Sequence, residues 1–153
     1  MRIGLHQSKM RHHSSEQFII EEKGRLISAA SGLVSPIVRR GFEAWASARK
    51  DAALPLAEHL RAEALVAVLP YVYLVDVIGE PGDALDFRYR LVGTDVVSHT
   101  EADNTGHLLS EVAEQGSQAI LIRLYELATE AGEPAVQRIA FRNRTGSRHW
   151  YET

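Results

Sequence analysis

Residues 69–94 read LPYVYLVDVIGEPGDALDFRYRLVGT and contain two apolar runs separated by a turn. The first run, residues 71–78, is rich in Val, Tyr, Leu and Ile, which are common in strands. Two glycines and a proline then interrupt the chain at residues 79–84, a pattern typical of a turn. The stretch therefore predicts a β-hairpin against which the rest of the chain packs.

The second run, residues 85–92, alternates between apolar and charged side chains. Four apolar residues share one face of this predicted strand: Leu85, Phe87, Tyr89 and Leu91. Such alternation is typical of a strand with one face on the core. The first strand is apolar on both faces except at Asp76. We therefore expect other elements to cover both faces. Asp76 is expected either to lie near an end of the strand or to pair with an arginine on the neighbouring strand.

Composition points to a single globular domain without cysteine chemistry. The chain has 153 residues, of which 45% are hydrophobic and 24% charged, and its net charge is -3. These values are ordinary for one folded domain and provide no basic field for nucleic acid or anionic lipid. The absence of cysteine excludes disulfides and thiolate sites. No apolar run nears the roughly 20 residues of a membrane span, and the first residues lack a secretory apolar core, so we expect a cytoplasmic protein.

Two helices are predicted before the hairpin. Ser35 and Pro36 form a helix start, because Ser is a preferred N-cap and Pro fits the first helical position. An apolar stripe follows at helical spacing and consists of Val38, Phe42 and Trp45. We expect this helix to end near residue 51 and a second amphipathic helix to cover residues 56–69.

The chain after the hairpin predicts short helical turns, a long helix and a second pair of strands. Residues 95–111 show little periodicity, whereas residues 117–131 carry apolar side chains at helical spacing. Gly132 follows at the position where glycine commonly ends a helix. Residues 135–142 alternate as a strand, and a further strand begins at residue 149. Helices combined with antiparallel hairpins predict an α+β fold.

We interpret residues 1–35 as a flexible polar leader. His12 and His13 lie in it without a third ligand at a helical or hairpin spacing, so they predict no metal site. The alternative is a short helix that docks on the domain through Phe18, Ile19, Ile20, Leu26 and Ile27.

Several stretches resemble the PAS domain, in particular the single-domain PAS proteins of alphaproteobacteria. The most specific is FRYRLVGT at residues 87–94, followed by a D-x-T-G turn at residues 103–106. The others are Trp45 with Arg49, Leu54-Pro55, Leu69-Pro70 with YLVDV at residues 73–77, and GEP at residues 132–134. The resemblance covers residues 36–153. It implies a five-stranded antiparallel sheet, helices over one face and a cavity between them.

The sequence departs from the PAS pattern at one strand. A PAS sheet has a fifth strand between its first and fourth strands, and residues 36–153 supply no segment for it. Either the chain is truncated at its C-terminal end or a partner segment fills the gap, because unpaired strand edges favour aggregation. The domain expected at residues 36–153 is therefore incomplete at this point.

The resemblance implies a ligand cavity between the sheet and the long helix. The residues that we expect to line it are Tyr73, Tyr89, Leu91, Ile120, Leu124, Ile139 and Phe141. No metal or cofactor is predicted. PAS haem sensors commonly use a histidine on the long helix, and residues 117–131 contain none; His99 and His107 are the alternative haem ligands. Flavin could bind only noncovalently. Because the chain lacks cysteine and the long helix lacks histidine, we expect a colourless protein.

Two charged clusters are interpreted as solvated surface. The basic one surrounds the second hairpin turn without interleaved aromatic residues and consists of Arg138, Arg142, Arg144, Arg148 and His149. The acidic one matches no metal loop and consists of Asp83, Asp86, Asp95, Glu101 and Asp103.

Three hypotheses follow. In the first, the chain is a sensory or regulatory PAS module that binds a small ligand or a partner protein and signals by contact. In the second, it is a structural module with a filled core that forms a homodimer through Val38, Phe42 and Trp45. In the third, it is an enzyme that uses Asp76 or a loop carboxylate as a base. We favour a non-enzymatic, dimeric sensor, and a cavity of roughly 300 Å³ or more would separate the first hypothesis from the second.

Overall fold

The computed structural model describes residues 2–5, 18–60, 62–80, 83–100, 103–112, 117–142 and 148–153. These residues form helices and two antiparallel sheets, which confirms the predicted α+β class. The single five-stranded sheet implied by the PAS resemblance is corrected, because the described strands form two separate three-stranded sheets. One sheet has the order β1-β3-β4 and contains β1 (Arg2–Leu5), β3 (Val72–Ile78) and β4 (Asp86–Val92). The other has the order β2-β5-β6 and contains β2 (Phe18–Leu26), β5 (Ala135–Arg142) and β6 (Arg148–Glu152).

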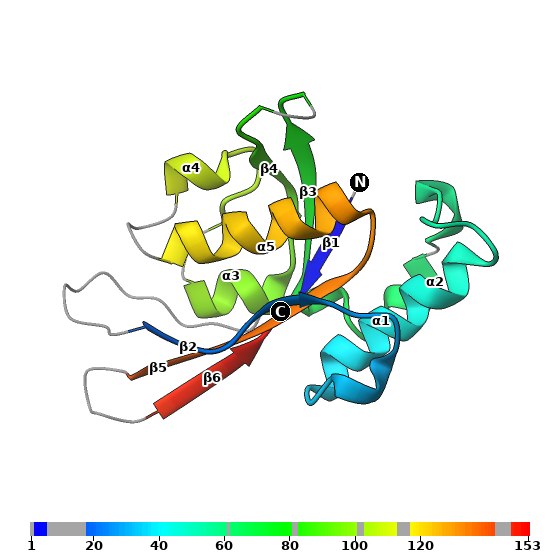
Figure 1. Ribbon diagram of the computed structural model, residues 1–153, viewed down its shortest axis with the longest axis horizontal. Helices are drawn as coiled ribbons and strands as arrows, with labels where there is room; N and C mark the ends of the chain where they lie inside the picture. The colour runs from blue at the N-terminus through cyan, green and yellow to red at the C-terminus, as the bar shows by residue number, and fades with distance from the viewer. Residues whose placement is uncertain are drawn as a thin grey trace.

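The helices form two groups around these sheets (Figure 1). The first group is α3 (Thr94–Thr100), α4 (Leu109–Val112) and α5 (Ser117–Ala131). The second is α1 (Pro36–Arg49) and α2 (Ala62–Leu65), which lie beside β1 in the view of Figure 1. α5 has the bounds that the sequence predicts, and Gly132 after it has a φ of +66°, as expected for a glycine that ends a helix.

The predicted hairpin is present as β3 and β4. Phe87 and Tyr89 are buried, whereas Arg88 and Arg90 are exposed, so the alternation of β4 is confirmed up to Arg90. Nε of Arg90 lies 3.3 Å from Oδ2 of Asp76, which confirms the expected arginine partner of this carboxylate. The core therefore forms on the side of the hairpin that carries Phe87 and Tyr89.

The prediction that Leu91 shares the core face of β4 with Phe87 and Tyr89 is wrong. The pairing of the two strands shifts, because Leu74 faces Leu91 whereas Val75 faces Tyr89. Arg90 is thus an extra residue, a β-bulge, and a bulge re-aims the side chains that follow it. Leu91 is 38% exposed, and Val92 packs against the core in its place. Alternation in a sequence gives no sign of such a bulge.

Residues from the chain before β3 cover its second face, as expected. Val72 is fully buried and packs with Leu65 and Val68. The single helix expected at residues 56–69 is nevertheless wrong. The chain forms a 3-10 turn (Ala57–His59), the short α2 and a second 3-10 turn (Leu69–Tyr71). An uninterrupted helix would bury little more apolar surface here, because Leu56 and Val66 are exposed. Most of the stability of a helix in a protein comes from packing of its apolar face.

The N-terminal segment forms strands in its described part, which corrects the interpretation of residues 1–35 as a flexible leader and the alternative of a helix at residues 18–27. β2 pairs with β5, and β1 pairs with the edge of β3 that the sequence leaves without a neighbour. Strand pairing here overrides the helical propensity of the Glu and Lys residues in β2. Gly24 lets β2 pass close to α5, since an added Cβ would lie 3.1 Å from Cδ1 of Leu124. His12 and His13 lie outside the described residues.

The bulge gives a direct test of this packing. We expect Phe87→Ala to lower the free energy of unfolding by about 3–5 kcal/mol, because Phe87 is fully buried. Leu91→Ala should cost about 1 kcal/mol or less, because that side chain already contacts solvent. Urea denaturation of both variants measures the difference, and equal losses would show that Leu91 belongs to the core.

Candidate functional site

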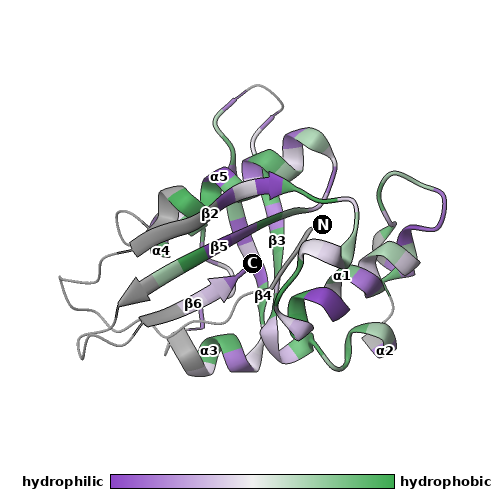
Figure 2. Cartoon of the chain, turned by 60° about the horizontal axis from the view of Figure 1, so that its bottom comes forward, coloured by the Kyte–Doolittle hydropathy of each residue, from purple (hydrophilic) through white to green (hydrophobic). Residues whose placement is uncertain are grey.

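A cavity of about 300 Å³ lies at the seam between the two sheets, and we call it the seam cavity. Its lining includes Val75 from β3, Val136 from β5 and Thr153, which follows β6. Figure 2 shows the end of the chain between the two sheets and beside α1. The volume falls at the lower end of the range of small-molecule pockets, about 300–1,000 Å³.

α1 forms one wall of the seam cavity. Its start is fixed locally, because the Ser35 side chain accepts a hydrogen bond from the Val38 amide at 3.3 Å and Pro36 occupies the first turn. The apolar stripe of the helix then faces the cavity through Val38, Gly41, Phe42 and Trp45. Gly41 is buried, so the helix backbone itself forms part of the wall where a larger side chain would occupy space.

The facing walls come from α5 and from both sheets. Leu124, Tyr125 and Ala128 of α5 line the seam cavity together with Val75 and Val136. Glu133, in the turn between α5 and β5, is exposed and is the one charged residue among the lining residues that the structure describes. The site is therefore an apolar chamber with a single acidic group at an exposed position.

A buried carboxylate fixes α1 against the sheets. The side chain of Glu152 in β6 is only 1% exposed. Its Oε2 accepts hydrogen bonds from the Val34 amide at 2.9 Å and the Ser35 amide at 2.7 Å, and Oε1 lies 3.0 Å from the Val34 amide. Nε of Arg138 lies 4.0 Å from Oε1. We call these contacts the Glu152 anchor, and they hold the residues that lead into α1.

The Glu152 anchor has two supports. Backbone hydrogen bonds join Gln137 and Thr153 in both directions, at 2.9 and 3.1 Å, so the β5–β6 ladder continues past Glu152. On the other side, Nη2 of Arg39 donates to the Leu33 carbonyl at 2.7 Å and tightens the loop before α1. A negative charge at this end of α1 is also favoured by the helix dipole.

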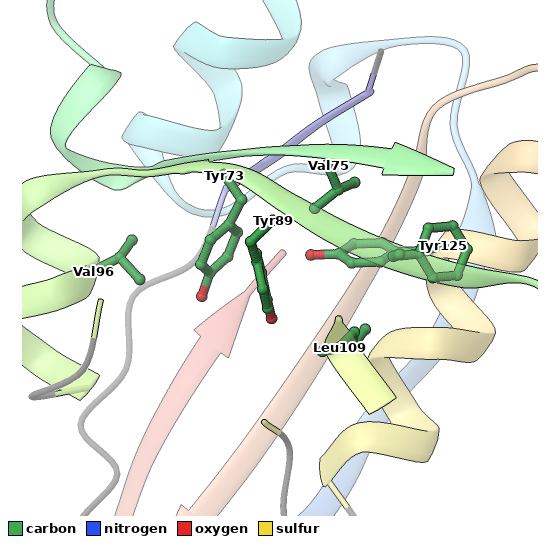
Figure 3. Close-up of a cluster of buried hydrophobic side chains, with 7 residues drawn as sticks. Tyr73, Val75, Tyr89, Val96, Leu109 and Tyr125 are labelled. Atoms are coloured by element: carbon green, nitrogen blue, oxygen red, sulfur yellow. The ribbon is translucent and has the colours of Figure 1, made fainter. Parts of the chain in front are cut away.

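A tyrosine cluster, Tyr73, Tyr89 and Tyr125, fills the space between the hairpin and the first helix group. The ring centroids of Tyr73 and Tyr89 are 5.6 Å apart, and Tyr125 meets Phe87 edge-on at 5.2 Å. Figure 3 shows the Tyr125 hydroxyl directed toward Tyr89. That hydroxyl is buried and has no hydrogen-bond partner in the part of the chain that the structure describes.

Burial keeps these phenols protonated. It raises the pKa of Tyr89 to about 12 and raises the pKa of Tyr125 well above its usual value. The pKa of Tyr73 is raised mainly by burial and further by the neighbouring Tyr125 and Tyr89. The tyrosine cluster is thus a neutral, packed core beside the seam cavity.

The structure separates the residues that the sequence predicts at a ligand site. Tyr73 and Tyr89 lie in the tyrosine cluster, whereas Leu91 lies on the surface. Ile120 is half-buried in α5 and Ile139 is buried in β5. Leu124 lines the seam cavity. The side chain of Phe141 lies outside the described part. The three residues expected at a dimer interface, Val38, Phe42 and Trp45, all line the seam cavity and so face their own chain. The homodimer stays a prediction.

Sequence reasoning missed Gly41, Glu133 and Glu152. Gly41 was within reach, because it falls on the same helical face as Val38 and Trp45 at a spacing of three and four residues. Glu133 was noticed only as part of the GEP stretch. Glu152 gives no local signal, since a single glutamate in a short strand is ordinarily exposed.

The histidines and charged clusters singled out in the sequence are only partly described by the structure. No group of three or more His, Asp or Glu residues gathers there as a metal site would require. Nδ1 of His107 lies 3.9 Å from Oε2 of Glu111 in an exposed pair. The side chains of His99 and His149 and all of Arg144 lie outside the described residues.

The comparisons with known proteins give no relatives. No protein-family model matches the chain, and neither curated proteins nor solved structures yield a match. Among the described helices, none is long and apolar enough to cross a membrane.

Removal of the Glu152 carboxylate tests the anchor. We expect Glu152→Ala to lower the free energy of unfolding by about 2–4 kcal/mol, because two amides lose a charged acceptor in a partly buried place. Glu58→Ala is the matched control, because the side chain of Glu58 is 77% exposed. Denaturant unfolding compares the two, and a loss no greater than that of the control would contradict the anchor.

Alkaline titration tests the tyrosine cluster. The pKa of Tyr89 is about 12 in the folded chain, whereas the usual value is 10.0. The unfolded chain therefore loses this proton at a lower pH than the folded chain does. The free energy of unfolding is thus unaffected by Tyr89 below pH 10 and falls as the pH rises from 10 toward 12. We expect phenolate absorbance to show fewer than the five tyrosines of the chain ionising before unfolding begins. Ionisation of all five while circular dichroism is unchanged would contradict the burial of the cluster.

Proposed function

We propose that the chain is a sensory or regulatory module of the PAS type that binds a small, largely apolar ligand in the seam cavity and signals by contact. The observation that carries this proposal is the cavity itself, about 300 Å³ with predominantly apolar walls. Pockets of this size and lining are the usual binding places of small organic molecules. A structural module with a filled core has no need of such a space, because interiors are otherwise close-packed.

α1 is the element best placed to report occupancy. It forms one wall of the seam cavity and is held at its N-terminal end by the Glu152 anchor. On its other side, Arg39, Arg40 and Glu43 are exposed. A ligand that pushes on Phe42 or Trp45 would shift a helix whose outer surface a partner protein can contact.

The PAS assignment is supported by the α+β architecture and by the hairpin that carries the FRYRLVGT stretch. The seam cavity includes α5 among its walls, as the resemblance implies, although Leu124 is the one expected lining residue that it contains among those that the structure describes. An enzyme is less well supported, because Asp76 pairs with Arg90 and does not line the cavity.

A second candidate is a module that associates with a second copy of the chain. The favouring observation is that the segment between α1 and β3 carries several exposed apolar side chains, namely Leu54, Leu56, Val66 and Leu69, which are 36–63% exposed. A contiguous patch of such side chains can mark a protein contact. We rank this candidate second, because Leu54 also lines the seam cavity.

Filling the cavity tests the first proposal. We expect the wild-type chain to bind indole, a neutral probe, with heat detectable by titration calorimetry. Gly41→Leu should weaken this binding by about tenfold or more, because the new side chain begins at the cavity wall. Gly41→Ala is the matched control, since it adds one methyl group and favours the helix.

A second variant guards against misfolding of Gly41→Leu. Ala128→Leu fills the cavity from the α5 wall and should weaken indole binding in the same way. If indole does not bind the wild type, or binds both filled variants as tightly as the wild type, the proposed binding site is wrong. Native mass spectrometry of the purified chain would independently show a retained natural ligand.

A further inference from the structure

Three aromatic side chains lie among the lining residues of the seam cavity. Phe42 and Trp45 come from α1, with ring centroids 6.0 Å apart and an interplanar angle of 32°. Tyr125 lines the cavity from α5. Aromatic rings prefer offset or edge-on neighbours with centroids about 4.5–7 Å apart. Walls of this kind favour a flat ring over a flexible chain.

The charge on the lining has one sign. Glu133 is the one charged residue among the described lining residues, and it is exposed in the turn that follows α5. Gly132 before it has a φ of +66°, which sets the direction of this turn. The guanidinium of Arg49 lies 5.4 Å from the Trp45 ring centroid, but Arg49 does not line the cavity.

We propose that the seam cavity selects flat aromatic molecules that carry a positively charged amine, with the ring between Phe42, Trp45 and Tyr125 and the ammonium group at Glu133. This inference rests on the proposed function, because it assigns a ligand class to the same cavity. An ammonium group at Glu133 keeps contact with water, so it forms an ion pair without full desolvation. A carboxylate in the same place would meet repulsion.

Three probes of one ring system test the selectivity by titration calorimetry. Tryptamine carries an ammonium group, indole is neutral, and indole-3-acetate carries a carboxylate. We expect the wild type to bind tryptamine about fivefold or more tightly than indole-3-acetate, as expected for one exposed charge at close range. Glu133→Gln should bring this ratio close to one. Glu130→Gln, an exposed change on α5 outside the lining, is the control and should retain the ratio.

The possible results distinguish failure of ligand binding in the seam cavity from failure of the amine selectivity. If none of the probes binds, the proposed ligand-binding function falls together with the inference. If indole binds and Gly41→Leu weakens it, but tryptamine and indole-3-acetate bind equally, the function stands and the amine selectivity is wrong. A tryptamine preference that survives in Glu133→Gln would likewise overturn the role of Glu133.

Discussion

The arrangement of this chain depends on one buried carboxylate. Glu152 accepts hydrogen bonds from the amides of Val34 and Ser35, which are more than a hundred residues earlier in the sequence. A charged group is stable at 1% side-chain exposure only if its oxygens are satisfied. The two amides and Arg138 satisfy them, and in return the entry to α1 has a fixed place on the β2-β5-β6 sheet.

The seam cavity follows from this constraint. Val38 and Phe42 pack on Ile27, Leu33 and Val136, so α1 rests on the second sheet. On its other side, Ile37 and Ala44 pack against the cluster that contains Val72 of β3. Gly41 and Ala128 face this gap with too little volume to fill it. The cavity is thus bordered by α1, α5 and both sheets, and it is open to solvent on the side of Leu54 and Glu133.

Much of the fold is predictable from local patterns. The start of α1, the whole of α5 and the strand β5 follow from Ser35-Pro36, from the helical spacing before Gly132 and from the alternation after Pro134. These signals are local, so one sequence is enough to read them.

The parts that could not be predicted depend on contacts distant in sequence. β2 is a strand because it pairs with β5, although its Glu and Lys residues suit a helix. The bulge at Arg90 turns Leu91 outward and removes it from the expected ligand site. The place where the sequence predicts a ligand is filled by the phenols of the tyrosine cluster, whereas the seam cavity lies beside it between the two sheets.

Hydrogen exchange in Glu152→Gln tests most directly whether this anchor holds α1 over the cavity. The substitution keeps the size of the side chain and removes its charge. We predict faster exchange of the amides in residues 37–49 than in the wild type, while the amides of β3 and β4 keep their protection. Unchanged protection of residues 37–49, or an equal loss across the whole chain, would contradict the account.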